Sequence, residues 1–341
     1  MKNNDPIEFK LAGGAAAQTL GLLNALYITK KTSREFRIRY FPHSTGTYWP
    51  FAIDFLLSDH EVSSKSAQIR GLMDDQTFTV GKIIRDHPLE SRYFSYERLL
   101  KWLRGLRLEF VLRRLTGEIA LEARPLRLEL ITKRTRRVSG GFVPMLNAEV
   151  LKELDSRFRA GRDEKSPFSS NPDTKESYIA IHYRIGDKRA KFTHDKDFGG
   201  DGIFSPRGFE RILSQLDLPK LKVYVVSDEP TVAQSLLQEV GIEANLFEDK
   251  HDIWIDLFRL SQASVFIGSW SQVSQLAAIC VANNGGTSFL PSTTQVGTKV
   301  YWNIPNTEFF PPEFLDEIHP IYSPEFKLDD GAHKAYGEKP S

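Results

Sequence analysis

The fold class follows from one short stretch, YIAIHYRIGD at residues 178–187. Its first four residues, Tyr178 to Ile181, are apolar or aromatic, and a run of this composition predicts a buried strand. The polar residues that follow should emerge at the carboxyl end of that strand, where open α/β sheets bind their ligands. Alternation along the strand places His182 and Arg184 on the same face.

The chain after this stretch continues as alternating strands and helices. We expect further strands at 222–226, 244–247 and 265–267, and helices at 206–216, 231–240, 253–263 and 271–282. Ser205 stands where an N-cap of the first of these helices belongs, and Asp252 lies near the start of the third. Strands that alternate with helices of about 10–15 residues predict a parallel, doubly wound sheet, and therefore an α/β protein.

The N-terminal part of the chain predicts a second unit of the same kind. A strand at Ile7–Leu11, the pair Gly13-Gly14, a helix at Ala15–Tyr27 and a strand at Phe36–Phe41 give the order β–loop–α–β. The polar residues 161–177, with two prolines and four serines, predict a linker. We therefore expect two Rossmann-like domains facing a central cleft, at 1–165 and 166–305, followed by a partly disordered C-terminal extension at 306–341.

Composition excludes several classes of protein. The chain has 341 residues, 40% of them hydrophobic and 26% charged, with a net charge of +1 and a single cysteine, Cys280. A disulfide-stapled secreted domain and a globally basic nucleic-acid-binding protein are therefore excluded. No apolar run reaches the roughly 18 residues of a spanning helix, and the polar residues 1–5 do not resemble a secretory signal. We expect a cytoplasmic protein, or one peripheral to the inner membrane surface.

Residues 98–137 depart from this overall charge balance. They hold twelve basic residues against four acidic ones, and apolar residues recur at helical spacing from Leu99 to Phe110. One interpretation is a basic amphipathic helix that contacts anionic lipid. The other is an ordinary helix that packs its apolar stripe on the core and leaves its arginines in solvent.

Three segments carry the candidate chemistry. Arg184 offers a planar donor fork suited to phosphate, and Asp187 follows it in the same turn. Ser227 and Asp228 end the next strand, where they face a ligand or cap the following helix. Ser269 and Ser271 open the last helix, where they bind an anion or serve as simple caps. His182 is either part of this pocket or a satisfied, half-buried imidazole.

These three segments, in this order, resemble the α-1,2/α-1,6-fucosyltransferase superfamily. The elements are His-x-Arg-x-Gly-Asp at 182–187, a strand ending in Ser-Asp, and a serine-rich strand-to-helix turn, and they are most similar to glycosyltransferase family 11. The turn at Gly13–Gln18 is similar to the Gly-Gly-x-Gly-Asn-Gln turn that begins those enzymes. This chain departs from the family at Ile185, where a second arginine is common, and at Ala16-Ala17, which replace Gly-Asn.

The resemblance implies a GT-B fold and an inverting, metal-independent transfer of fucose from GDP-fucose to a hydroxyl of a glycan or glycolipid, in polysaccharide biosynthesis. It makes 1–165 the acceptor side and 166–305 the nucleotide-sugar side. Arg184 would hold the pyrophosphate, with His182 in the same pocket and Asp187 supporting the loop. The other implied contacts are Ser227 and Asp228 to the nucleoside, Ser269 and Ser271 to phosphate, and Gly14 and Gln18 from the first domain. Another nucleotide sugar, or a non-catalytic nucleotide- or sugar-binding protein of the same fold, remains an alternative.

No catalytic base is identified by the sequence. Asp195, Asp197 and Asp201 lie in a glycine-rich loop that either covers the acceptor or is a solvated connection. Asp195-Lys196-Asp197 also forms an Asp-x-Asp pattern, which binds Mn²⁺ in another glycosyltransferase architecture. It follows no predicted strand, which argues against a metal there, and the resemblance implies neither a metal nor any other cofactor.

Overall fold

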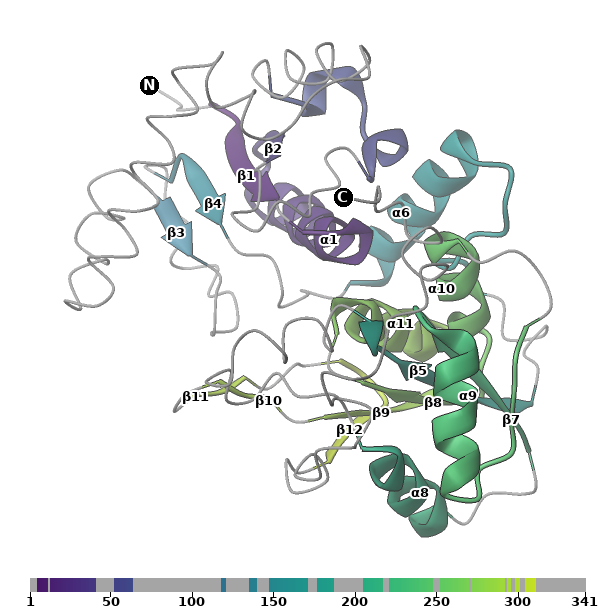
Figure 1. Ribbon diagram of the computed structural model, residues 1–341. Coiled ribbons are helices and arrows are strands. Elements are labelled where there is room, and N and C mark those ends of the chain that lie inside the picture. The colour runs from purple at the N-terminus through teal and green to yellow at the C-terminus, as the bar shows by residue number, and fades with distance from the viewer. Residues whose placement is uncertain are drawn as a thin grey trace, which may run out of the picture. The chain divides into compact units, whose positions relative to one another are not determined.

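The computed structural model describes residues 5–11, 13–40, 52–63, 118–120, 135–139, 147–170, 177–186, 205–216, 221–247, 252–269, 271–291, 293–295, 298–300 and 304–310 (Figure 1). The chain forms two compact units, 1–150 and 151–341. The sequence-based boundary at 165 lies fifteen residues beyond this division, after helix α6 (Ala148–Gly161).

The first unit contains a parallel sheet in the order β2-β1-β4-β3. Its strands are β1 (Ile7–Leu11), β2 (Phe36–Tyr40), β3 (Glu118–Ala120) and β4 (Arg137–Ser139). Helix α1 (Ala15–Thr32) joins β1 to β2, and two 3-10 turns, η1 (Asp54–Leu56) and η2 (Asp59–Glu61), follow. The predicted β–loop–α–β order is confirmed, with a helix that continues five residues beyond Tyr27.

The second unit contains a six-stranded sheet in the order β12-β9-β8-β5-β6-β7, with every neighbouring pair parallel. Its strands are β5 (Tyr178–Tyr183), β6 (Lys222–Ser227), β7 (Ala244–Asn245), β8 (Val265–Gly268), β9 (Thr287–Pro291) and β12 (Thr307–Phe310). Its helices are α8 (Pro206–Gln215), α9 (Pro230–Glu239), α10 (Ile253–Ser261) and α11 (Gln272–Asn283). The prediction of an α/β protein with a parallel, doubly wound sheet is confirmed.

Two strands of this sheet, β9 and β12, were not predicted. β12 pairs with β9 in parallel, so the sheet continues beyond residue 305. A short antiparallel pair, β10 (Thr293–Gln295) with β11 (Thr298–Val300), lies between them in the chain.

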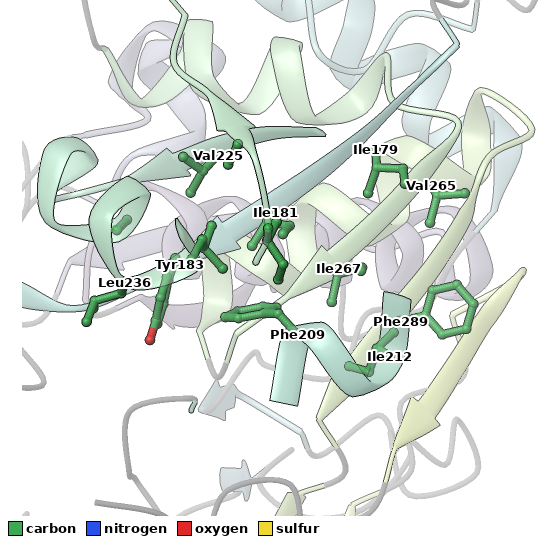
Figure 2. Packing of buried hydrophobic residues seen from close by; sticks show 14 of the residues in the cluster. Ile179, Ile181, Tyr183, Phe209, Ile212, Val225, Leu236, Val265, Ile267 and Phe289 are labelled. Carbon is green, nitrogen blue, oxygen red and sulfur yellow. The ribbon is translucent and has the colours of Figure 1, made fainter. Parts of the chain in front are cut away.

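Successive side chains of β5 point to opposite faces of the sheet, and each face packs against different helices. Ile179, Ile181 and Tyr183 belong to a buried apolar cluster that includes Phe209 of α8 and Leu236 of α9 (Figure 2). The intervening side chains turn to the opposite face, where α10 and α11 pack. The side chain of His182 therefore lies outside the apolar cluster and contacts α11.

The interpretation of residues 161–177 as a linker is wrong for residues 161–170. Phe168 is 1% exposed and packs edge-on against Phe158 and Trp254, with ring centroids at 5.8 and 6.4 Å. Asn283 Nδ2 donates to the Phe168 carbonyl at 3.0 Å, and Ser170 Oγ donates to the Asn283 carbonyl at 3.2 Å. One buried aromatic side chain in a polar stretch thus binds the segment to the second unit.

Several sequence-based expectations lie outside the described residues. These are the helix expected from Leu99 to Phe110 and most of the basic segment 98–137, the glycine-rich loop with Asp195, Asp197 and Asp201, and the tail from 311. Within the described ranges, none of the helices combines the length and the apolar character that crossing a membrane requires.

Candidate functional site

The strand order of the second unit reverses between β5 and β8. From β5 the chain builds outward through β6 to β7, and it then returns to the other side of β5 to add β8, β9 and β12. In doubly wound sheets the crevice for a ligand lies outside the carboxyl ends of the strands at such a reversal. The candidate site is therefore the edge where β5 ends at Tyr183 and β8 ends at Gly268.

Ser269 joins the ends of these two strands. His182 and Gly268 are register partners, and the Ser269 N–H donates to the His182 carbonyl at 3.0 Å. The Arg184 N–H in turn donates to Ser269 Oγ at 3.1 Å. The main chain of Arg184 is thus fixed beside the start of α11, while its side chain is only half-buried.

Asp228 holds the loop that follows Arg184. Its carboxylate accepts from the N–H groups of Ile185 at 2.9 Å and Gly186 at 3.0 Å. Ser227 Oγ donates to Asp228 Oδ1 at 3.3 Å and accepts from the Glu229 N–H at 3.0 Å. The alternative that Asp228 or Ser227 is the N-cap of α9 is wrong, because the N-cap position is Glu229, whose side chain makes no cap hydrogen bond.

Gly186 and Glu229 make this loop compact. A Cβ added at Gly186 would lie 3.0 Å from Asp228 Oδ2 and 3.1 Å from Glu229 Oε1, so any side chain there would displace the carboxylates. Glu229 is 2% exposed and was missed by sequence reasoning. Its only signal in the sequence is its place directly after Ser227-Asp228 at the end of β6.

The start of α11 is the third part of the candidate site. Ser271 is the N-cap, and its Oγ accepts from the Ser274 N–H at 3.0 Å. The amides of Gln272 and Val273 meet no acceptor in the part of the chain that the structure describes. Free amides and the helix dipole favour an anion at this position. Ser271 therefore caps the helix, as one of the two interpretations predicted, and leaves its first amides open.

His182 is buried beside this helix start. It is 5% exposed, and its Nδ1 lies 2.7 Å from Ser274 Oγ and 3.3 Å from Ser271 Oγ. Burial, with a smaller contribution from the charge of Arg184, lowers the pKa of His182 to about 3. The imidazole is therefore neutral near pH 7. Ser274, which is fully buried, is a second residue that sequence reasoning missed.

Gly14 and Gln18 belong to the first unit. Gly13 has a φ of 82°, which glycine adopts readily, and Gly14 is the N-cap of α1. Gln18 is fully buried, and its Nε2 donates to the Gly13 carbonyl at 2.9 Å. Both residues thus shape the turn after β1, and their contact with a ligand in the other unit stays a prediction.

Two further expectations concern Asp187 and a metal. Asp187 lies outside the described residues, so its place in the loop stays a prediction. Among the residues that are described, no three His, Cys, Asp or Glu side chains gather in a way that would hold a metal ion.

Comparison with known proteins gives distant structural likenesses only. No protein-family model and no curated protein matches the sequence. A NodZ α-1,6-fucosyltransferase structure soaked with GDP-fucose matches 80% of this chain and 92% of its own, at 12% identity and a TM-score of 0.35. POFUT1 in complex with GDP-fucose matches 91% and 98%, at 12% identity and a TM-score of 0.36.

A heptosyltransferase is similar to the same degree. The Escherichia coli enzyme WaaC with ADP matches 90% of each chain, at 9% identity and a TM-score of 0.37. Because all three TM-scores lie below 0.5, we base the functional proposal on the residues of the site.

Proposed function

We propose that this protein is a glycosyltransferase of the GT-B type that transfers fucose from GDP-fucose, with inversion and without a metal, to a hydroxyl of a glycan or glycolipid. The observation that carries the proposal is the convergence at the β5–β8 reversal of Arg184, Ser269 and the open amides of α11. The order of the three sequence segments that resemble fucosyltransferases supports the same conclusion.

The chemistry of the site follows from where charge develops. Cleavage of the bond between sugar and phosphate leaves negative charge on the departing nucleotide, and fixed donors around that phosphate stabilise the transition state. The Arg184 guanidinium, the hydroxyl of Ser269 and the amides at 272 and 273 are such donors. The sugar develops oxocarbenium character, and an acceptor hydroxyl attacks its opposite face.

The remaining residues act around this centre. Asp187 supports the loop, and Ser271 shapes the phosphate end of the site by capping α11. Ser227 and Asp228 face the nucleoside. The Asp228 carboxylate accepts from the loop and from Ser227 Oγ, and its half-buried position would let a guanine N–H approach it as well. For Gly14 and Gln18 of the first unit, a contact with the donor is predicted from the resemblance alone.

Arg184 gives the first test of the proposal. A bidentate contact between arginine and phosphate contributes about 1.5–3 kcal/mol, so Arg184→Ala should weaken GDP binding roughly tenfold to a hundredfold. Arg211→Ala is a matched control, because Arg211 is an exposed arginine on α8 of the same unit. Equal GDP affinity in the folded Arg184 variant and the control would remove Arg184 from the site.

A nucleotide panel tests the donor. Thermal stability should rise with GDP but not with UDP, ADP or CMP, and EDTA should leave the GDP effect unchanged. Stabilisation by UDP or ADP would assign another nucleotide sugar, and a requirement for metal would contradict the mechanism. Slow hydrolysis of GDP-fucose without acceptor then separates an enzyme from a non-catalytic binding protein, which would show none.

The acceptor and the cellular setting are part of the same proposal. We expect a glycan or a lipid-linked glycan in polysaccharide biosynthesis, and a lipid-linked acceptor would suit peripheral contact of the basic segment 98–137 with anionic lipid at the cytoplasmic side of a membrane. Salt-sensitive co-sedimentation with anionic liposomes would support this, and co-sedimentation no greater than with neutral liposomes would contradict it.

A further inference from the structure

Three buried polar groups beneath the proposed phosphate site form one hydrogen-bonded chain. Ser271 Oγ lies 3.3 Å from Ser274 Oγ, and Ser274 Oγ lies 2.7 Å from His182 Nδ1. Ser271 Oγ already accepts from the Ser274 N–H at 3.0 Å. His182, Ser271 and Ser274 are all at most 6% exposed, so their donors need partners within the protein or its ligand.

The position of the proton on His182 decides how many of these groups find partners. If Nε2 carries the proton, the Ser271 hydroxyl donates to Ser274 Oγ and the Ser274 hydroxyl donates to Nδ1, so only the Nε2–H is left to meet a ligand. If Nδ1 carries the proton, it donates to Ser274, Ser274 donates to Ser271, and both the Ser271 hydroxyl and the Nε2 lone pair lack a partner among the described residues. Each buried polar atom without a partner costs free energy, so the first form is favoured.

We propose that Ser274 is a positioning residue that holds His182 as the neutral Nε2–H form, so that His182 offers a hydrogen-bond donor, and not a base, to the oxygen atoms of the nucleotide-sugar ligand. This inference rests on the proposed function for the identity of the ligand. The free ring nitrogen supports it: among the described residues, Nε2 meets no hydrogen-bond partner, whereas Nδ1 meets two.

The packing of β8 against α11 sets the distance between Ser274 and His182. A Cβ added at Gly268 would lie 2.7 Å from Ser274 Cβ and 2.9 Å from Ser274 Oγ. Only a residue without a side chain at 268 allows α11 to approach the sheet this closely. Ser274 is therefore fixed by packing, and the ring of His182 is oriented by Ser274.

A donor without charge suits this location. Arg184 lies two residues from His182 and already supplies a positive charge, and its charge disfavours a second one on the imidazole. A neutral Nε2–H contributes a directed hydrogen bond to a phosphate or sugar oxygen, and it does so over the whole range of pH in which the ring stays neutral.

Nitrogen-15 NMR of the histidine-labelled, full-length protein tests the assignment, with His182→Gln used to identify the signal. We expect Nε2 protonated and Nδ1 unprotonated in the ligand-free protein, and a shift of the Nε2–H signal when GDP is added. Ser274→Ala should give a mixture of the two forms and weaken GDP binding about three- to tenfold, the effect of one neutral hydrogen bond. Ser261→Ala, which removes another fully buried hydroxyl of this unit, should leave both unchanged.

The outcomes separate this inference from the proposed function. A wild-type His182 protonated at Nδ1, or a spectrum that Ser274→Ala and the double variant Ser271→Ala/Ser274→Ala both leave unchanged, would overturn the positioning role. The expected form in a protein that fails to bind GDP would support the role of Ser274 and contradict the proposed function. The double variant removes both hydrogen-bond partners of Nδ1. If Ser274→Ala alone has only a weak effect, the double variant therefore still decides whether these hydroxyls set the protonated nitrogen of His182.

Discussion

Replacing Asp228 with asparagine removes the charge that holds the loop after Arg184. The carboxylate accepts from two consecutive main-chain N–H groups, at 2.9 and 3.0 Å. Asparagine keeps one oxygen, and its amide group must then face an N–H that has lost its acceptor. The loop that carries Arg184 should therefore loosen, although the strands on either side stay paired.

The magnitude follows from the two hydrogen bonds. A hydrogen bond to a charged group contributes about 1.5–3 kcal/mol, and a neutral one about 1 kcal/mol. Asp228 is half-buried, so water compensates part of the loss. We expect the free energy of unfolding of the second unit to fall by about 2 kcal/mol, a decrease in Tm of roughly 4–8 °C.

Urea unfolding and amide hydrogen exchange measure the two consequences. The variant should unfold at lower urea concentration with an unchanged m-value, and the amides of Ile185 and Gly186 should exchange faster. Glu243→Gln is a matched control, because Glu243 is an exposed carboxylate of the same unit. A free energy within about 0.5 kcal/mol of the wild type, with unchanged exchange at 185 and 186, would refute the role given to Asp228.

Three further predictions concern stability. Because the pKa of His182 falls from 6.5 in the unfolded chain to about 3, the unfolded state binds the extra proton between these values, and stability is lost as pH falls through this window. Wild type should lose about 3 kcal/mol more than His182→Gln between pH 6.5 and 4, and parallel pH profiles of urea unfolding would contradict this. Gly268→Ala should cost about 1–3 kcal/mol, since the new methyl group meets Leu290 Cδ2 at 2.5 Å and Ser274 Cβ at 2.7 Å, and a Tm equal to that of wild type would disprove that packing. Phe168→Ala should cost about 3–5 kcal/mol and expose residues 161–170 to proteases, whereas a resistant variant would show that Phe168 is not the anchor.

The elements of the second unit were predictable because their signals are local. Runs of apolar residues predicted β5, β6 and β8. Two caps expected from the sequence are present: the Ser205 side chain accepts from the Arg207 N–H, and the Asp252 side chain from the Trp254 N–H. β9 and β12 escaped prediction because Thr287–Pro291 and Thr307–Phe310 mix polar with apolar residues, and the first of them ends in a proline.

The partners within the site were not predictable, because they depend on strand register. Asp228 was expected at the carboxyl end of its strand, but its contact with Ile185 and Gly186 spans more than 40 residues and requires Tyr183 to lie opposite Ser227. Nothing in the sequence indicated a role for Ser274, since a serine in the first turn of a helix is common. Its contact with His182 arises only when α11 packs on the sheet.

The proposed nucleotide site is the edge between β5 and β8, and hydrogen–deuterium exchange with and without GDP tests that placement. We predict that GDP slows exchange in the segments 182–186 and 271–275, with Arg184→Ala abolishing the effect at a GDP concentration that saturates the wild type. Failure of GDP to slow exchange there, or protection confined to other segments, would contradict the placement of the site.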